Sequence, residues 1–470
     1  MAVNFEHSEY QANVSDWNMV STLCEGDSAV KRAGVTYLPD PVVAVEETRG
    51  EIAAIYERYK QRAMFFNAVG HTRTSLVGAV FRKNPSLTTP ETIAYVGEDV
   101  DGAGVSIYQQ SQGVMADVLT TGRHGLLVDY PPTESAASVD DVRKGIVRAN
   151  IVRYKAQQII NWRYTQVGGK SVLSLCVLSE DATESDEYSE KCIPQLRALR
   201  LIDGFYVVEL HRKNEKGEWF IFDVITPTMA NGARWTEIPF AFVGATNNDA
   251  SCDGAPLFDM AVANRKHYQL SADWYNALYF AGQPQPYISG LNIEWRDVLL
   301  EKGIVVGSRA PIPLPEGGAF GYATVPADTA IQKEIANIEA QMVALGARLT
   351  TPGEATKTAT QSAGEQEAAH SVISLCAENV SEAYGRCLEW MLGFVGGSGE
   401  CEYQISNDIS VINWDAQILG AITMAVQGGM LPRADGIMFL QRVGLIRADK
   451  TVEEITGELD NGDTSLPFEG

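Results

Sequence analysis

The sequence lacks a long hydrophobic run. Its nearest candidate, Ile418–Val426, is far short of the roughly 18 apolar residues that a membrane-spanning helix needs. The first residues, MAVNFEHSEYQANVSDW, contain neither the basic segment nor the apolar core of a signal peptide. The sequence therefore predicts no membrane role and no secretory leader.

Cysteine and histidine are too sparse, and too irregularly spaced, to predict chemistry. The 7 cysteines contain no C-x-x-C pair and are odd in number, and the 6 histidines show no metal-binding spacing. Free thiols in a reducing cytosol are the expected state of such cysteines. We expect neither a metal nor a cofactor.

Positive charge is also in short supply. The chain has 37 Lys and Arg against 60 Asp and Glu, a formal net charge of -23 in 470 residues. A protein that grips nucleic acid over a broad surface neutralises phosphates with basic side chains, so this balance argues against one. It does not exclude a protein that DNA slides past. The hydrophobic fraction of 45% is ordinary for a folded protein with a sizeable core.

The first half of the chain mixes helical and strand patterns. Helices are predicted from Glu46, where apolar residues recur every three or four positions, and over Ser106–Thr120. The residues Thr88–Asp99 and the acidic run Glu180–Glu190 are predicted as loops, and Lys216-Gly217 as a hairpin turn. The predicted strands are Gly125–Tyr130, Ser171–Leu178, Phe205–His211, Trp219–Ile225 and Phe240–Val243.

The second half is dominated by long helices. Pro256–Ala281 has no internal Pro or Gly, and about 26 helical residues make a rod of roughly 40 Å. A proline-rich stretch, residues 283–328, predicts short strands and turns before a heptad helix at Thr329–Leu349. The heptad seam predicts a partner for this helix. After a small-residue polar loop, further helices are expected over Glu367–Phe394 and, in the tail, over Trp414–Gln427, Arg433–Val443 and Thr451–Leu459.

Three short motifs resemble catalytic or ligand-binding patterns but are incomplete. Gly168-Gly169-Lys170-Ser171 lacks the earlier glycine of a phosphate-binding loop, because position 164 is Tyr. Asp99-x-Asp101-Gly102 lacks the remaining oxygen ligands of a calcium loop. Ser28-x-x-Lys31 lacks the accompanying Lys-Thr-Gly of an acyl-transfer site. The interpretation is a protein that is not an enzyme.

The order of the parts resembles the portal (head-to-tail connector) proteins of tailed bacteriophages. This order is a mixed α/β body, a rod helix, a proline-rich island, a heptad helix, a bare polar loop, a long helix and a helical tail. Several phrases follow in the order of one portal subfamily, and together they cover about residues 15–460: Tyr37-Leu38-Pro39, Arg62-Ala63-Met64-Phe65, Val80-Phe81-Arg82-Lys83-Asn84-Pro85, Gly122-Arg123-His124-Gly125-Leu126, Ile159-Ile160-Asn161-Trp162-Arg163 and Ala255-Pro256-Leu257-Phe258-Asp259.

The resemblance implies an α+β portal fold assembled as a ring. Residues 1–254 and 367–412 would be the wing, 255–282 and 329–349 the stem helices, 283–328 the clip, 350–366 the tunnel loop and 413–470 a small helical crown. A ring of about twelve copies at one capsid vertex would form the channel for packaging and ejecting double-stranded DNA. If the acid excess faced that bore, it would repel phosphates and keep the DNA mobile.

Three sets of residues would carry these roles. The DNA-facing tunnel loop would use Thr351, Glu354, Thr356, Lys357, Thr358, Thr360, Gln361 and Ser362. The subunit interface of the stem would use Asn264, His267, Tyr268, Ile331, Ile335, Ile338 and Met342. The clip residues facing the packaging motor and the tail adaptor would be Trp295, Arg296, Arg309 and Glu316.

The partners implied are further copies of the chain, the major capsid protein, the terminase large subunit (transiently), head–tail adaptor or tail proteins, and DNA bound without sequence specificity. Assembly would take place in the host cytoplasm and the product would be part of the virion. The alternative is another head–tail adaptor or minor head protein that does not line the main channel. The adaptor would bind pre-formed rings instead of closing into its own.

Overall fold

The structure is a computed structural model of the chain. The residues it describes are 3–41, 49–130, 148–185, 188–229, 231–283, 285–290, 292–296, 314, 316–323, 329–350 and 371–406, with 432, 434, 437, 451 and 454–457. The chain divides into two compact units, Met1–Asp408 and Ile409–Gly470. All the elements below belong to the first unit, and the predicted tail helices lie almost wholly outside the described residues.

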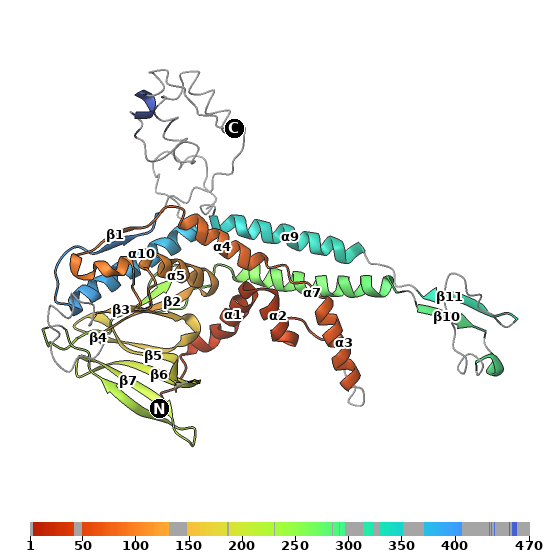
Figure 1. The fold of residues 1–470 in the computed structure, drawn as a ribbon, viewed down its shortest axis with the longest axis horizontal. Helices are drawn as coiled ribbons and strands as arrows, with labels where there is room; N and C mark the ends of the chain where they lie inside the picture. Colours follow the sequence, from red (N-terminus) through yellow and green to blue (C-terminus); the bar gives the residue numbers. More distant parts are fainter. Residues whose placement is uncertain are drawn as a thin grey trace. The chain divides into compact units, whose positions relative to one another are not determined.

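Helices form most of the N-terminal segment (Figure 1). They are α1 (Ser8–Glu25), α2 (Asp27–Ala33), α3 (Arg49–Arg62), α4 (Ala68–Val80) and α5 (Ile107–Thr121), with the short 3-10 turns η1 (Gly34–Thr36), η3 (Glu91–Gly97) and η4 (Ala156–Gln158).

Local sequence sets both ends of α5. Ser106 and Gln109 form a reciprocal capping box at its start, and Gly122 (φ 70°) takes the left-handed conformation that ends it. A Cβ at Gly122 would lie 2.5 Å from the Asp253 carbonyl oxygen, so only glycine fits there.

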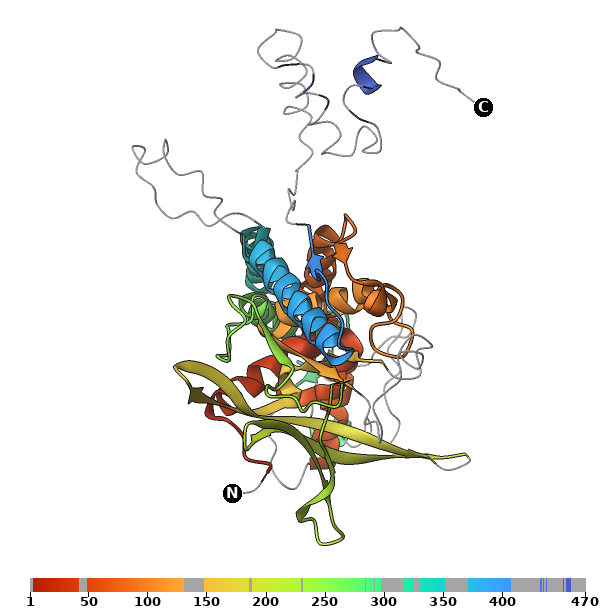
Figure 2. The same ribbon diagram turned by 90° about the vertical axis from the view of Figure 1, so that its left-hand side faces the viewer.

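A three-stranded antiparallel sheet forms the centre of the body. Its order is β3 (Asn150–Lys155), β2 (Arg123–Asp129) and β9 (Phe240–Gly244). The central strand β2 is buried over six of its seven residues, because α5 and α10 (Val372–Phe394) both contact it. Figures 1 and 2 show α10 and the larger sheet on opposite sides of this small sheet.

The larger sheet is a five-stranded antiparallel meander. It contains β4 (Ile159–Val167), β5 (Lys170–Ser185), β6 (Glu190–Ile202), β7 (Phe205–Lys213) and β8 (Trp219–Ile225), in chain order. Glycines with positive φ make the β4–β5 and β7–β8 turns, at Gly168, Gly169 and Gly217. The predicted hairpin at Lys216-Gly217 is therefore confirmed, and the Gly168-Gly169-Lys170 motif is a turn.

Two long antiparallel helices complete the first unit. In Figure 1, α7 (Phe258–Ala281) and α9 (Thr329–Thr350) lie side by side, joined through the hairpin of β10 (Gln285–Ser289) and β11 (Ala319–Ala323). The chain then enters α10 and ends this unit with β12 (Glu402–Gln404), which pairs with β1 (Ser86–Thr88). The predicted rod helix, heptad helix and third long helix are confirmed within a few residues.

Two loop predictions were wrong. The acidic run Glu180–Glu190 is not a loop: β5 continues to Ser185 and β6 starts at Glu190, with Asp181 opposite Pro194. The segment Thr88–Asp99 contains the turn η3, which seats Ile93 and Val96 in the core. Polar composition misled both predictions, because main-chain pairing and two buried side chains are enough to order such segments. The helices α1, α2 and α4 and the strands β1, β3, β4 and β6 were not predicted.

Candidate functional site

The apolar seam of α9 packs on α7 of the same chain. Ile338, Met342 and Leu349 are 4%, 5% and 8% exposed, whereas Ile331 and Ile335 are half-buried. The contacts described for the seam, chiefly with α7, are within one chain, and its role between subunits stays a prediction. The outward face of α9 stays open, and Val343 is 75% exposed there.

Asn264 fastens α7 to the start of α4. Its Oδ1 accepts a hydrogen bond from the Val69 amide at 3.0 Å, and its Nδ2 donates to the Phe66 carbonyl at 2.8 Å. The side chain is fully buried, so each of these bonds replaces one that water would otherwise make. Asn264 therefore joins the helical pair to the body.

The other two α7 residues predicted at a subunit interface are also buried in the chain. His267 Nε2 lies 3.3 Å from Glu339 Oε1 on α9, and its Nδ1 lies 3.4 Å from Ser271 Oγ. Tyr268 packs edge-to-face on Phe65, and burial raises its pKa to about 12. The contacts described for Asn264, His267 and Tyr268 are all within one chain, and their role between subunits stays a prediction.

The outer end of α7 is open and rich in aromatic residues. Tyr59 of α3 donates to Asp273 Oδ1 at 2.6 Å, and Arg62 binds Asn276 and lies over the Tyr279 ring. Burial, with the Asp273 carboxylate, raises the Tyr59 pKa far above its usual value. Beyond these contacts, one group of apolar side chains lies 36% to 51% exposed: Tyr275, Leu278, Tyr279 and Phe280.

The helical pair carries no net charge. On α7 the charged residues are Asp259, Arg265, Lys266 and Asp273, and on α9 they are Lys333, Glu334, Glu339 and Arg348. Each helix thus has two acids and two bases, in a chain of net charge -23. The exposed residues of α9 include the small Ala336, Ala340 and Ala344 beside polar ones such as Gln332 and Gln341. The acid excess of the chain therefore lies elsewhere.

The predicted clip residues fall in and around the β10–β11 hairpin. The Trp295 amide donates to Asn292 Oδ1 at 2.9 Å at the start of a helical turn that also contains Arg296. Glu316 is exposed in the turn before β11, and Tyr287 and Tyr322 on the hairpin are about half exposed. Trp295 and Arg296 thus lie on the same helical turn, and no contact of either with Glu316 is described. Arg309 and all the predicted tunnel-loop residues lie outside the described residues.

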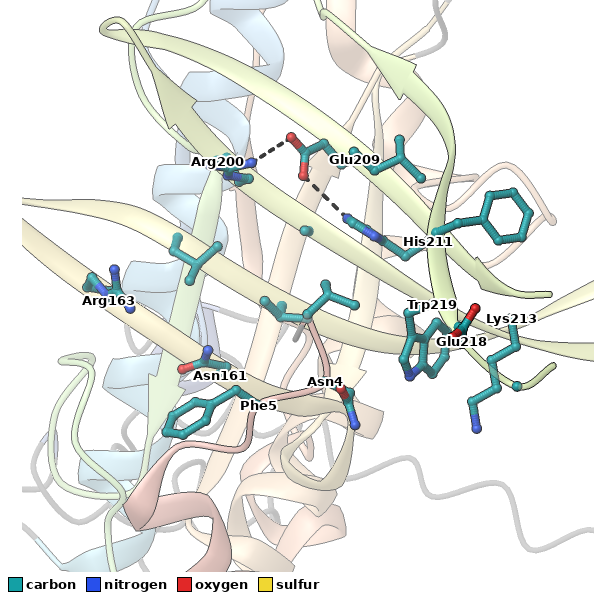
Figure 3. A pocket seen from close by; sticks show the side chains of 17 residues that line it. Asn4, Phe5, Asn161, Arg163, Arg200, Glu209, His211, Lys213, Glu218 and Trp219 are labelled. Carbon is teal, nitrogen blue, oxygen red and sulfur yellow. Dashed lines mark hydrogen bonds and ion pairs between the residues drawn. The ribbon is translucent and has the colours of Figure 1, made fainter. Parts of the chain in front are cut away.

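A concave polar site, unforeseen in the sequence, lies on the outer face of the five-stranded sheet (Figure 3). We call it the sheet groove; its cavity measures about 890 Å³. Glu209 accepts from Arg200 at 2.7 Å and lies 3.3 Å from His211 Nε2. The N-terminal segment, with Asn4 and Phe5, lies along one side of the groove, and Trp219 lies on the other.

The sheet groove has the composition of a binding surface. Its lining residues include Arg163, Arg200 and Lys213 but no Ser, Thr, Cys or Tyr, so His211 has no hydroxyl or thiol to activate there. The only sequence signal was the alternation of charged residues along β7, Glu209-x-His211-x-Lys213, which became a site only when β4, β6 and β8 came alongside.

The described part of the chain contains neither a metal-binding cluster nor a membrane-spanning helix. Within it, no three His, Cys, Asp or Glu side chains are grouped closely enough to hold a metal ion. No helix among those described is long and apolar enough to cross a membrane.

Comparison with known proteins gives a family match and likenesses to solved structures, two of which are described below. Residues 256–395, from just before α7 to just after α10, match the family described as Domain of unknown function (DUF4055). No curated protein matches the chain.

The solved structures that resemble it include the neck of an empty GTA particle, at 15% identity and a TM-score of 0.39, covering 79% of this chain and 89% of that one. A chain from the virion of a native gene transfer agent (GTA) particle matches at 13% identity and the same TM-score, covering 87% of this chain and 98% of that one. Both TM-scores are too low to establish a common fold, so neither match decides the function.

Proposed function

We propose that this chain is a portal protein of a tailed-phage-like particle. In this proposal about twelve copies close into a ring at one capsid vertex, around a channel for double-stranded DNA. The role is structural, not enzymatic, and the ATP-driven motor is a separate protein. The chain is a component of the virion that is assembled in the host cytoplasm.

The observation that carries the proposal is the antiparallel pair α7 and α9. It leaves the body at Phe258, turns back through a small β-hairpin and returns to α10, which is deeply buried. This arrangement suits the order of stem, clip and wing implied by the sequence. One face of the pair is anchored through Asn264 and the α9 seam, and the other face is open for neighbours or for the channel.

The neutral charge of the pair supports passage of DNA past it. Strong phosphate contacts would hold a polyanion in place, and a strongly acidic wall would add a barrier. A surface with small and uncharged polar residues and equal numbers of acids and bases does neither. For these two helices, the proposal therefore expects a neutral wall of the bore instead of an acidic one.

The remaining assignments belong to the same proposal. Residues 1–254 and 367–412 form the wing, 283–328 the clip that meets terminase and the tail adaptor, 350–366 the tunnel loop, and 413–470 a small crown. The tunnel loop would contact DNA through Lys357 and its small polar residues. The major capsid protein would surround the wing.

Electron microscopy of the purified full-length chain tests the proposal. We expect closed rings with about twelve-fold symmetry and a central pore of roughly 20 Å or more, wide enough for duplex DNA. Monomers, dimers or open filaments at every salt concentration would refute it. Binding only to pre-formed rings of another protein would instead favour an adaptor or a minor head protein.

A further inference from the structure

The hairpin of β5 and β6 extends beyond both of its neighbouring strands. The pairing of β4 with β5 begins at Leu178, and the pairing of β6 with β7 begins at Gln195. The two strands stay paired with each other as far as Ser185 and Glu190. We call the projecting part, Asp181–Ser185 with Glu190–Pro194, the acidic arm. Five residues of strand make it about 17 Å long.

The acidic arm is exposed on both faces. Only Ala182 and Ile193 are half-buried, and the other described residues of the arm are exposed. A two-stranded ribbon is only marginally stable in water without a further surface to cover it. Within the chain its described anchor is the ion pair of Glu184 with Arg212, at 2.9 Å. The arm therefore has a structural need for a partner.

Charge identifies what that partner offers. The acidic arm carries Asp181, Glu184 and Glu190 against one base, Lys191, and the sequence between its two strands adds Asp186 and Glu187. Asp181 and Glu190 face the same side as the sheet groove. The sheet groove carries Arg163, Arg200 and Lys213 against Glu209 and Glu218, a net positive charge in a strongly acidic chain. Arg200 and His211 already hold Glu209. Among the described residues, neither Arg163 nor Lys213 forms an ion pair.

The sheet groove also offers an apolar surface. Phe5 is 55% exposed on one side of it, and Phe220 and Ile221 are 44% and 51% exposed on β8. This strand is the last of the sheet, and no further described strand pairs with its outer edge. A surface with apolar sides and unpaired cations matches a ribbon of acidic residues.

We propose that the acidic arm of one copy of this chain seats in the sheet groove of the next copy. The arm extends away from its own groove, past the ends of β4 and β7, so an arm and a groove that meet belong to different copies. Because they are different surfaces, the contact is head-to-tail, and its repetition closes a ring or continues as a filament. The inference rests on the proposed function, to which it adds a specific contact between neighbours.

Cross-linking tests the contact directly, because the arm already carries an exposed cysteine. Cys192 lies opposite Thr183 in the arm. In the full-length Glu218→Cys variant, where position 218 is at the rim of the groove, oxidation should link Cys192 to the new cysteine of a neighbour. Repetition around a ring should give a ladder of two, three and more chains on a denaturing gel.

Two controls are matched to this variant. Adding Cys192→Ser to Glu218→Cys should abolish the ladder, and Ala12→Cys, at an exposed site on α1, should give none. Rings that form without a link from Cys192 to the cysteine introduced at position 218 would overturn the arm–groove contact and leave the proposed function standing. Absence of rings in the wild type would refute the proposed function, and the cross-link would still decide the contact. A ladder that stops at two chains would overturn the head-to-tail arrangement.

Charge reversal gives a second, independent test. Asp181→Lys with Glu190→Lys should raise the concentration needed for assembly about tenfold, as should Arg163→Glu with Lys213→Glu. Combining all four changes should recover most of the loss. The control for the first pair is Glu91→Lys with Glu98→Lys, at exposed sites on and beside η3. It changes the net charge as much as Asp181→Lys with Glu190→Lys does and should leave assembly unaltered. If the combined variant assembled no better than either pair, the proposal would be wrong.

Discussion

The helices α10 and α7 differ in how much of their surface the chain itself covers. In α10 the buried residues run from Ile373 to Phe394 and leave one exposed stripe, at Glu382, Arg386 and Glu389, because the helix lies among β2, β9, β12, α4 and α5. In α7 the buried residues stop at Ala272, and its last turns expose aromatic side chains. The first helix stabilises the body of one chain, whereas the second offers surface for contacts beyond it.

The largest expected difference between the two helices is in the free energy of unfolding after one large aromatic side chain is removed from each. Phe394 is fully buried, stacks on Tyr130 at 4.9 Å and lies 4.3 Å from Trp235. Phe394→Ala should lower the free energy of unfolding by about 3–5 kcal/mol. Phe280→Ala, at a residue 51% exposed, should change it by less than about 0.5 kcal/mol. Urea unfolding at a fixed protein concentration measures both, and equal losses would contradict the comparison.

The body should also contain the largest response to acid. His124 of β2 is fully buried, and burial lowers its pKa from 6.5 to about 4 despite Asp117 at 3.4 Å. Between these two pH values the unfolded chain binds more protons than the folded one, so acidification favours unfolding. Between pH 7 and pH 4 this protonation should lower the free energy of unfolding by about 3 kcal/mol.

The His124→Gln variant checks this prediction. Its free energy of unfolding should vary less steeply with pH between 6.5 and 5 than that of the wild type, whatever its absolute stability. His71→Gln, at an exposed site on α4, is the control and should leave the slope unchanged. Parallel curves for His124→Gln and the wild type would show that this histidine does not titrate as inferred.

The smallest expected effect lies where the two regions meet. Asn264→Ala removes the hydrogen-bond partner of both the Val69 N–H and the Phe66 carbonyl. It should lower the free energy of unfolding by about 2–3 kcal/mol. Asn276→Ala, farther along the same helix, removes one half-buried bond with Arg62 and should cost under about 1 kcal/mol. Thermal unfolding of the two variants measures the difference. A larger loss for Asn276 would place the anchor at the outer end of α7.

The sequence by itself determined α3, α5 and the long helices α7, α9 and α10, but not α1, α2 or α4. The absence of internal Pro and Gly predicted α7, and the heptad spacing of apolar residues predicted α9, because a helix is made of contacts only a few residues apart. The same local reasoning gave the Lys216-Gly217 hairpin and identified the Gly168-Gly169 motif as a turn. It also set the limits on chemistry, since none of the short motifs was complete.

Only the tertiary structure decided what each surface faces. The sequence predicted the apolar seam of α9. It did not predict that α7 of the same chain covers this seam, because that contact depends on the return of the chain through β10 and β11. The polar composition of the run between Glu180 and Glu190 predicted a loop. Its residues are instead ordered by main-chain pairing of β5 with β6, which composition does not indicate. The sheet groove had no sequence motif, since its residues come from separate strands. Such contacts between distant residues depend on packing, which local patterns do not encode.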